Sequence, residues 1–164
     1  MRYPASPNLL DWVSSSLRWL ILFGLTISLA TGGGLSLEAE ITLLLAAAWS
    51  LCLTVLAALG RRFPGQRAVT VGVDALLAAL LFYFCGWTSI WVGVLPVASA
   101  AMYFQWRGGA IAALAFSLVQ AALALAESTA AAVALGLAPL GVFYLLFGLL
   151  LGYLSGRMRD FLTK

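Results

Sequence analysis

Long apolar runs separated by short polar turns are the main pattern along this chain. A membrane-spanning helix needs about 20 mostly apolar residues, and six runs approach or exceed that length. They cover residues 9–31, 41–60, 69–85, 90–106, 110–126 and 140–156. The pattern therefore predicts an all-α fold, a polytopic membrane bundle of six transmembrane helices within a domain of residues 1–156.

Two apolar stretches need further interpretation. Residues 9–19 are amphipathic, so we expect them to lie at the membrane interface, with Arg18 extending back to the cytoplasmic headgroups. The apolar stretch of residues 130–155 is too long for one straight span, and it contains Pro139. It forms either a short lead-in at residues 130–138 followed by the sixth helix, or a single tilted and kinked helix.

The composition supports a membrane location. Apolar residues make up 63% of the chain and charged residues 9%, whereas a soluble domain carries roughly 25% charged residues. There is no histidine, and the two cysteines, Cys52 and Cys85, lie inside apolar runs, where a thiol packs as a small hydrophobe. No spacing suits a catalytic group or a metal. We therefore expect a bilayer as the main partner, with no enzymatic activity in this chain, no cofactor or metal, and no nucleic-acid partner.

The distribution of charge predicts the orientation. Lys and Arg gather in the cytoplasmic loops of membrane proteins. With six spans, all nine basic residues fall on one side of the membrane or reach it, and the opposite loops hold Glu38, Glu40 and Glu127. We therefore expect a multi-pass protein of the cell inner (plasma) membrane with both termini in the cytoplasm.

Polar residues inside apolar runs are the candidate functional residues, because they are costly in a bilayer. Asp74 lies about 8 Å into its predicted helix. It pairs with an arginine at the cytoplasmic boundary, binds a proton or a cation, or has a packing role specific to the fold. The arginines near that boundary are Arg61, Arg62, Arg67 and Arg107. Gln120, near the middle of the fifth predicted helix, is expected to hydrogen-bond across helices, with contact to a ligand as the alternative.

Aromatic residues gather where the third and fourth predicted helices meet. Tyr83, Trp87 and Trp91 lie at the outer end of these helices. Either they anchor the protein in the membrane interface, where aromatic side chains are enriched, or this rim binds a small apolar ligand.

The last predicted helix carries a row of small residues and continues past the membrane. Gly148, Gly152 and Gly156 share one face, which lets another helix approach closely. That helix belongs either to the same chain or to a second copy in a homodimer. Residues 157–164 remain amphipathic, so we expect the start of a cytoplasmic signalling helix, followed by a coiled coil and further domains.

Residues 71–109 resemble the middle of the six-helix integral-membrane sensor (input) regions of bacterial histidine kinases and related signalling proteins. In that family an aspartate opens the third helix, a tyrosine and a Gly-rich turn close it, and a proline lies in the fourth. The matching residues are Asp74, Tyr83, Gly86 and Pro96. The turn CGWTSIW departs from the family, since it has one glycine and no proline. The resemblance implies an input module of a two-component system, whose last helix passes a stimulus to cytoplasmic output domains.

Three functions are consistent with the sequence. The leading hypothesis is a membrane-embedded signal-input domain of a sensor protein such as a histidine kinase, which responds to a lipid, a quinone-like or other small apolar molecule, or a physical property of the membrane. The alternatives are a small transporter or solute-binding membrane subunit, which needs a polar cavity near the midplane, and a membrane scaffolding protein, which needs a protein partner.

Overall fold

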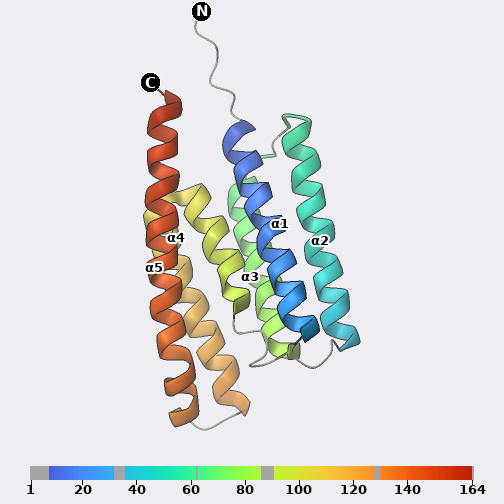
Figure 1. Cartoon of the computed structure of the whole chain (residues 1–164), viewed down its shortest axis with the longest axis vertical. Helices are drawn as coiled ribbons and strands as arrows, with labels where there is room; N and C mark the ends of the chain where they lie inside the picture. Colours follow the sequence, from blue (N-terminus) through green and yellow to red (C-terminus); the bar gives the residue numbers. More distant parts are fainter. Residues whose placement is uncertain (1–7, 32–35, 62, 86–90, 128–129, 164) are drawn as a thin grey trace, which may run out of the picture.

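The structure, a computed structural model, is a bundle of long helices (Figure 1). It describes residues 8–31, 36–61, 63–85, 91–127 and 130–163. Its helices are α1 (Asn8–Thr31), α2 (Leu37–Ala58), α3 (Gln66–Cys85), α4 (Val94–Glu127) and α5 (Ala130–Thr163). All five are long and apolar enough to cross a membrane.

The prediction of six transmembrane helices is wrong, because the runs predicted as the fourth and fifth spans, residues 90–106 and 110–126, contribute to one helix, α4. The turn expected at Gly108 and Gly109 is absent, since both glycines are helical. The chain bends instead at Gln105, whose backbone is non-helical with φ 60° and ψ −156°. The two arms of α4 fold back on each other at this one residue (Figure 1).

Gln105 adopts a backbone conformation that residues other than glycine rarely occupy. A positive φ with ψ near 180° costs a residue with a Cβ about 1–3 kcal/mol. We therefore expect Gln105→Gly to raise the free energy of unfolding by about 1 kcal/mol, measured by SDS-induced unfolding in mixed micelles. Ala110→Gly, at a helical position of the same element, should lower it by about 1 kcal/mol. Equal destabilisation by both variants would show that Gln105 is not strained.

Helix α2 begins four residues before the predicted run because its first turn is capped. The Ser36 side chain accepts a hydrogen bond from the Ala39 backbone N–H at 3.3 Å. Glu38 and Glu40 lie in the first turn, where negative charge is favourable against the helix dipole. The acidic residues therefore stabilise the start of α2 at the end of the bundle opposite the chain termini.

Helix α5 settles the open interpretation of the last apolar stretch, and α1 covers the whole first run. Residues 9–19 are part of the continuous helix α1, and their place at the membrane interface stays a prediction. Residues 130–138 belong to α5, which runs through Pro139 as a single helix. The last turns of α5 include most of residues 157–164, so the backbone is helical where the sequence predicted a continuing helix.

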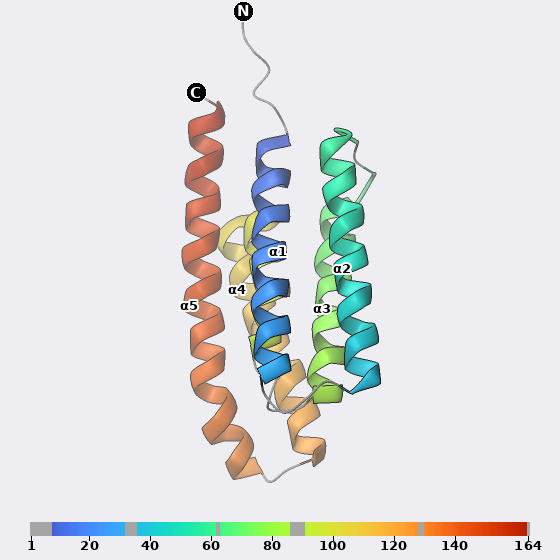
Figure 2. The same ribbon diagram turned by 45° about the vertical axis from the view of Figure 1, so that its right-hand side comes forward.

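The helices form two packing units that share α4. Helices α1, α2, α3 and the first arm of α4 meet around a small apolar cluster of Leu22, Ala46, Leu77 and Leu95, while α5 packs mainly along α4. A larger apolar core joins the two units, with buried residues from α1, α3, both arms of α4 and α5. The first turn of α1 and the last turn of α5 lie at the same end of the bundle (Figures 1 and 2). The α2–α3 turn with Arg61 and Arg67 lies at this end too, and the α4 bend at Gln105, followed by Arg107, points towards it. We call it the basic end.

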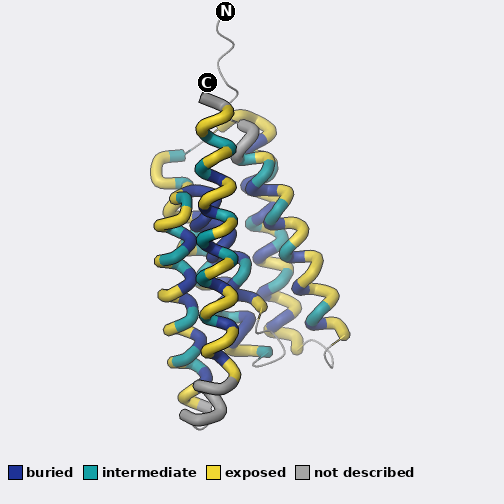
Figure 3. Tube along the Cα trace, turned by 60° about the vertical axis from the view of Figure 1, so that its left-hand side comes forward, coloured by how far each residue is buried: buried dark blue, intermediate teal, exposed yellow. Residues whose placement is uncertain are grey.

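The outer surface of the bundle is apolar. Exposed positions follow the outward faces of the helices (Figure 3), and many are large hydrophobic residues, such as Leu44 (69% exposed), Ile111 (69%) and Leu118 (71%). In water such a surface would be unfavourable, whereas lipid tails solvate it. The structure therefore supports a membrane protein that contacts the bilayer on all sides.

Candidate functional site

A buried ion pair joins α1 to α3 in the core of the first packing unit. The Arg18 guanidinium donates from Nη2 to Asp74 Oδ1 at 2.6 Å and from Nη1 to Asp74 Oδ2. Arg18 is 2% exposed and Asp74 is fully buried. Arg18 therefore does not extend to the headgroups as predicted, and it takes the place of the boundary arginines that were expected to pair with Asp74.

Two serines complete this site from the remaining two helices. Ser99 of α4 donates from Oγ to Asp74 Oδ2 and accepts from Arg18 Nη1 at 3.2 Å. Ser50 of α2 accepts from Arg18 Nη2 at 3.4 Å. Each helix of the unit thus contributes one side chain. We call Arg18, Ser50, Asp74 and Ser99 the polar cluster.

An apolar layer closes the polar cluster on the side away from the basic end. Its members come from the same four helices, each three or four residues from a cluster residue. They are Leu22, Ala46, Leu77 and Leu95, and all are buried. Because this layer excludes water, the ion pair lies in a medium where its mutual attraction is much stronger than at a surface.

Polar groups continue from the cluster towards the basic end. Ser14 and Thr70 are buried one turn away on α1 and α3, and their hydroxyls have no hydrogen-bond partner among the residues that the structure describes. Ser15 hydrogen-bonds to Thr54 at 2.5 Å, and Trp19 Nε1 donates to Thr54 Oγ1 at 3.1 Å. The cluster is therefore apolar on one side and polar on the other.

The chemistry of the cluster favours a structural or switching role over ion binding. The Asp74 oxygens already accept two hydrogen bonds from Arg18 and one from Ser99. A cation would have to displace the guanidinium. Within the described part of the chain, no group of three or more His, Cys, Asp or Glu side chains could hold a metal. A buried pair of this kind costs desolvation energy and is best attested as a device that specifies one packing.

A second set of contacts links the end of the first α4 arm to α5. The bend at Gln105 leaves the preceding carbonyls without their helical partners. Ser155 Oγ donates to the Met102 carbonyl at 2.9 Å, and Arg159 Nη2 donates to the Met102 and Tyr103 carbonyls at 2.6 and 2.9 Å. A cation is favourable at a helix C-terminus. We call Met102, Tyr103, Ser155 and Arg159 the carbonyl clamp.

The predicted glycine face of α5 packs within the chain. A Cβ on Gly148 would lie 2.7 Å from the Gly109 carbonyl oxygen, and one on Gly152 would collide with the backbone of Gln105 and Trp106. Gly156 lies at the edge of this contact, near the Gln105 side chain. The partner of Gly148 and Gly152 is therefore α4, and a homodimer, which stays a prediction, would have to use another face of α5.

Gln120 also joins α4 to α5. It is 1% exposed, and its amide hydrogen-bonds to the side chain of Tyr144 on α5. The Tyr144 hydroxyl in turn accepts from the Gly93 backbone N–H at 3.1 Å. This arrangement agrees with a packing role for Gln120, since its partner lies on a neighbouring helix.

The predicted aromatic rim is described only in part. Tyr83 is 59% exposed and makes an edge contact with Phe84, and Trp91 packs edge-on against Phe143 with ring centroids 5.1 Å apart. Trp87 and Gly86 lie outside the described residues. The structure does not bring Tyr83 together with Asp74, which lies at the opposite half of α3.

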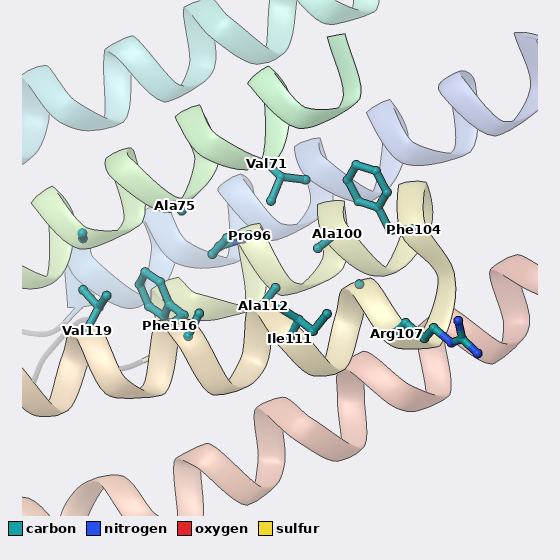
Figure 4. A pocket seen from close by; sticks show the side chains of 13 residues that line it. Val71, Ala75, Pro96, Ala100, Phe104, Arg107, Ile111, Ala112, Phe116 and Val119 are labelled. Atoms are coloured by element: carbon teal, nitrogen blue, oxygen red, sulfur yellow. The ribbon is translucent and has the colours of Figure 1, made fainter. Parts of the chain in front are cut away.

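A groove opens between α3 and the two arms of α4 (Figure 4). Its volume is about 560 Å³, within the range of pockets that hold one small-molecule ligand. Small and apolar residues line it, and Arg107 lies at one end. The groove is separate from the polar cluster, which faces the inside of the bundle.

Comparisons with protein-family models, curated proteins and solved structures found no match to this chain.

Proposed function

We propose that this chain is a membrane-embedded signal-input domain. The polar cluster holds α1, α2, α3 and the first arm of α4 in one packing, and α4 passes a change in that packing to α5. One observation supports this most directly. Ser99 contacts the ion pair, and the carbonyls of Met102 and Tyr103, about one turn further along the same arm, are held by α5.

The mechanism is a shift between two packings. A stimulus that favours a bundle without the Arg18–Asp74 pair would release Ser99, and the first arm of α4 would move with it. Because the carbonyl clamp connects that arm to α5, the last turns of α5 would move at the basic end. The arrangement is a contiguous physical network of the kind that carries coupling between distant sites.

The orientation that we propose places the basic end in the cytoplasm. Arg61 and Arg67 lie at this end, and Glu38 and Glu40 lie at the other. This separation follows the positive-inside rule. In a bacterial inner membrane, α5 would then leave the bundle on the side where a kinase output domain operates, as the resemblance to sensor regions suggests.

A distance measurement between α3 and α5 tests this proposal. Spin labels are placed at Val69→Cys and Phe161→Cys, which are 44% and 75% exposed. Cys52 and Cys85, both free thiols, are replaced by alanine. Double electron–electron resonance spectroscopy of the full chain in nanodiscs then measures the distance between the two labels. This distance reports the position of the last turns of α5 relative to α3.

Two matched serine variants decide the outcome. Ser99→Ala and Ser50→Ala each remove one buried hydroxyl that Arg18 contacts, but only Ser99 lies on α4. We expect Ser99→Ala to shift the distance by about 1–5 Å, the scale of helix shifts in switching proteins, and Ser50→Ala to leave it unchanged. If Ser99→Ala leaves the distance distribution of the unmodified labelled chain unchanged, the polar cluster does not control α5 and the proposal fails. If Ser50→Ala shifts the distance as much as Ser99→Ala does, the change is not passed through α4 and the proposed route fails.

A further inference from the structure

The groove beside α4 combines parts of three helical segments. Ala75 and Ala79 come from α3, Pro96 and Ala100 from the first arm of α4, and Ala112 and Phe116 from the second arm. The small side chains leave room between the helices, and the bend at Gln105 brings both arms to the same groove (Figure 4). The result is a long apolar channel along the side of the bundle.

The groove opens on the lipid-facing surface. Phe104, Ile111 and Val119 line it and are 46%, 69% and 42% exposed. A ligand can therefore enter sideways from the bilayer, without passing through the polar core.

The length of the groove matches the thickness of one leaflet of the bilayer. Its lining on the second arm runs from Arg107 to Val119, twelve residues apart, which is about 18 Å along a helix. One half of the hydrocarbon core is about 15 Å thick. A chain that follows the groove from Arg107 would thus end near the bilayer midplane.

The surroundings of Arg107 are typical of the headgroup level of a membrane. Its guanidinium lies over the Trp106 ring, 5.3 Å from the centroid, and Trp106 is half exposed. Exposed tryptophan and arginine are typical of the membrane interface. Arg107 also follows the bend at Gln105, on the side of the bundle's basic end, where other arginines favour negatively charged groups.

We propose that this groove binds an anionic phospholipid, with one acyl chain along the apolar channel and the phosphate at Arg107. The apolar lining suits a hydrocarbon chain, the length suits one leaflet, and the guanidinium at the mouth suits a phosphate. The site goes beyond the proposed function, because it would exist whether or not the bundle transmits a signal.

Native mass spectrometry of the full chain tests the site with two lipids of identical acyl chains. The purified protein is titrated with phosphatidylglycerol, which is anionic, or phosphatidylcholine, which has no net charge. We expect phosphatidylglycerol to bind about fivefold more tightly, the effect of one basic residue near an anionic headgroup. Equal binding of both lipids to the unmodified chain would overturn the assignment of an anionic headgroup.

Paired variants distinguish the contribution of the Arg107 charge to lipid binding from that of the apolar channel. Arg107→Gln should remove the preference for phosphatidylglycerol, whereas Arg61→Gln, an exposed arginine at the same end, should retain it. Ala112→Phe should fill the channel and weaken binding of both lipids, whereas Ala122→Phe, on the exposed surface of the same arm, should not. Ala79→Leu, which fills the channel from α3, replaces Ala112→Phe in this test if the latter variant does not fold. Identical binding within these pairs would overturn the proposal, and the α3–α5 distance would remain a separate test of signalling.

Discussion

Replacing Asp74 by leucine should lower the free energy of unfolding by about 3–5 kcal/mol, because the change leaves the Arg18 charge buried without its counter-ion. Arg18→Met should have a comparable effect by leaving the carboxylate unpaired. The double variant Arg18→Met/Asp74→Leu should recover most of this loss, since apolar side chains of similar volume often replace a buried ion pair at little cost. SDS-induced unfolding in mixed micelles measures all three variants.

The result of this double-mutant cycle distinguishes the pair from two independent residues. If the losses simply add in the double variant, Arg18 and Asp74 do not interact in the folded bundle. The control is Arg61→Met, which removes an exposed charge at the basic end. It should change stability by less than about 0.5 kcal/mol. A recovered double variant would also indicate that the pair is present for the specificity of packing, not for net stability.

Most of the helices could be predicted from the sequence, because long apolar runs leave the backbone in lipid no alternative to the helix. The number of helices could not be predicted in this way. Gly108 and Gly109 carry the usual signal for a turn, but Gly109 is needed for the close approach of Gly148, and a Cβ on Gly108 would collide with Phe104 and Ala100 on the first arm of α4. The chain reverses at Gln105, a residue whose type does not favour the conformation that it adopts.

The candidate site could be predicted only in part. Asp74 is identifiable as a carboxylate inside an apolar run, but its partner lies 56 residues earlier in the chain. An arginine near the start of a span is ordinarily expected to reach the headgroups. A signal was nevertheless present, because Ser14 and Arg18 lie four residues apart on α1, as Thr70 and Asp74 do on α3. Such polar rows on two helices indicate a shared interior, and only the packing of the bundle shows that they meet.

Gly152→Ala should lower the free energy of unfolding by about 1–3 kcal/mol, because the new methyl group overpacks the α4–α5 contact. It would meet the backbone of Trp106 and Gln105, which cannot move aside as a flexible side chain can. The control is Gly72→Ala, since a Cβ at this position of α3 has nothing within 4 Å. That variant should be neutral or more stable by up to about 1 kcal/mol, the gain in helix propensity.

The same substitution also connects packing to the proposed signal. Gly152 lies on the face of α5 that carries Ser155 and Arg159, so a displacement of α5 at the glycine would pull both donors away from the α4 carbonyls. We therefore expect Gly152→Ala to change the label distance between positions 69 and 161 as Ser99→Ala does, although the two substitutions lie at opposite ends of the connection. An altered stability with an unchanged distance would mean that the glycine contact only holds the helices together. A change in both would place the carbonyl clamp on the path from the polar cluster to the end of α5.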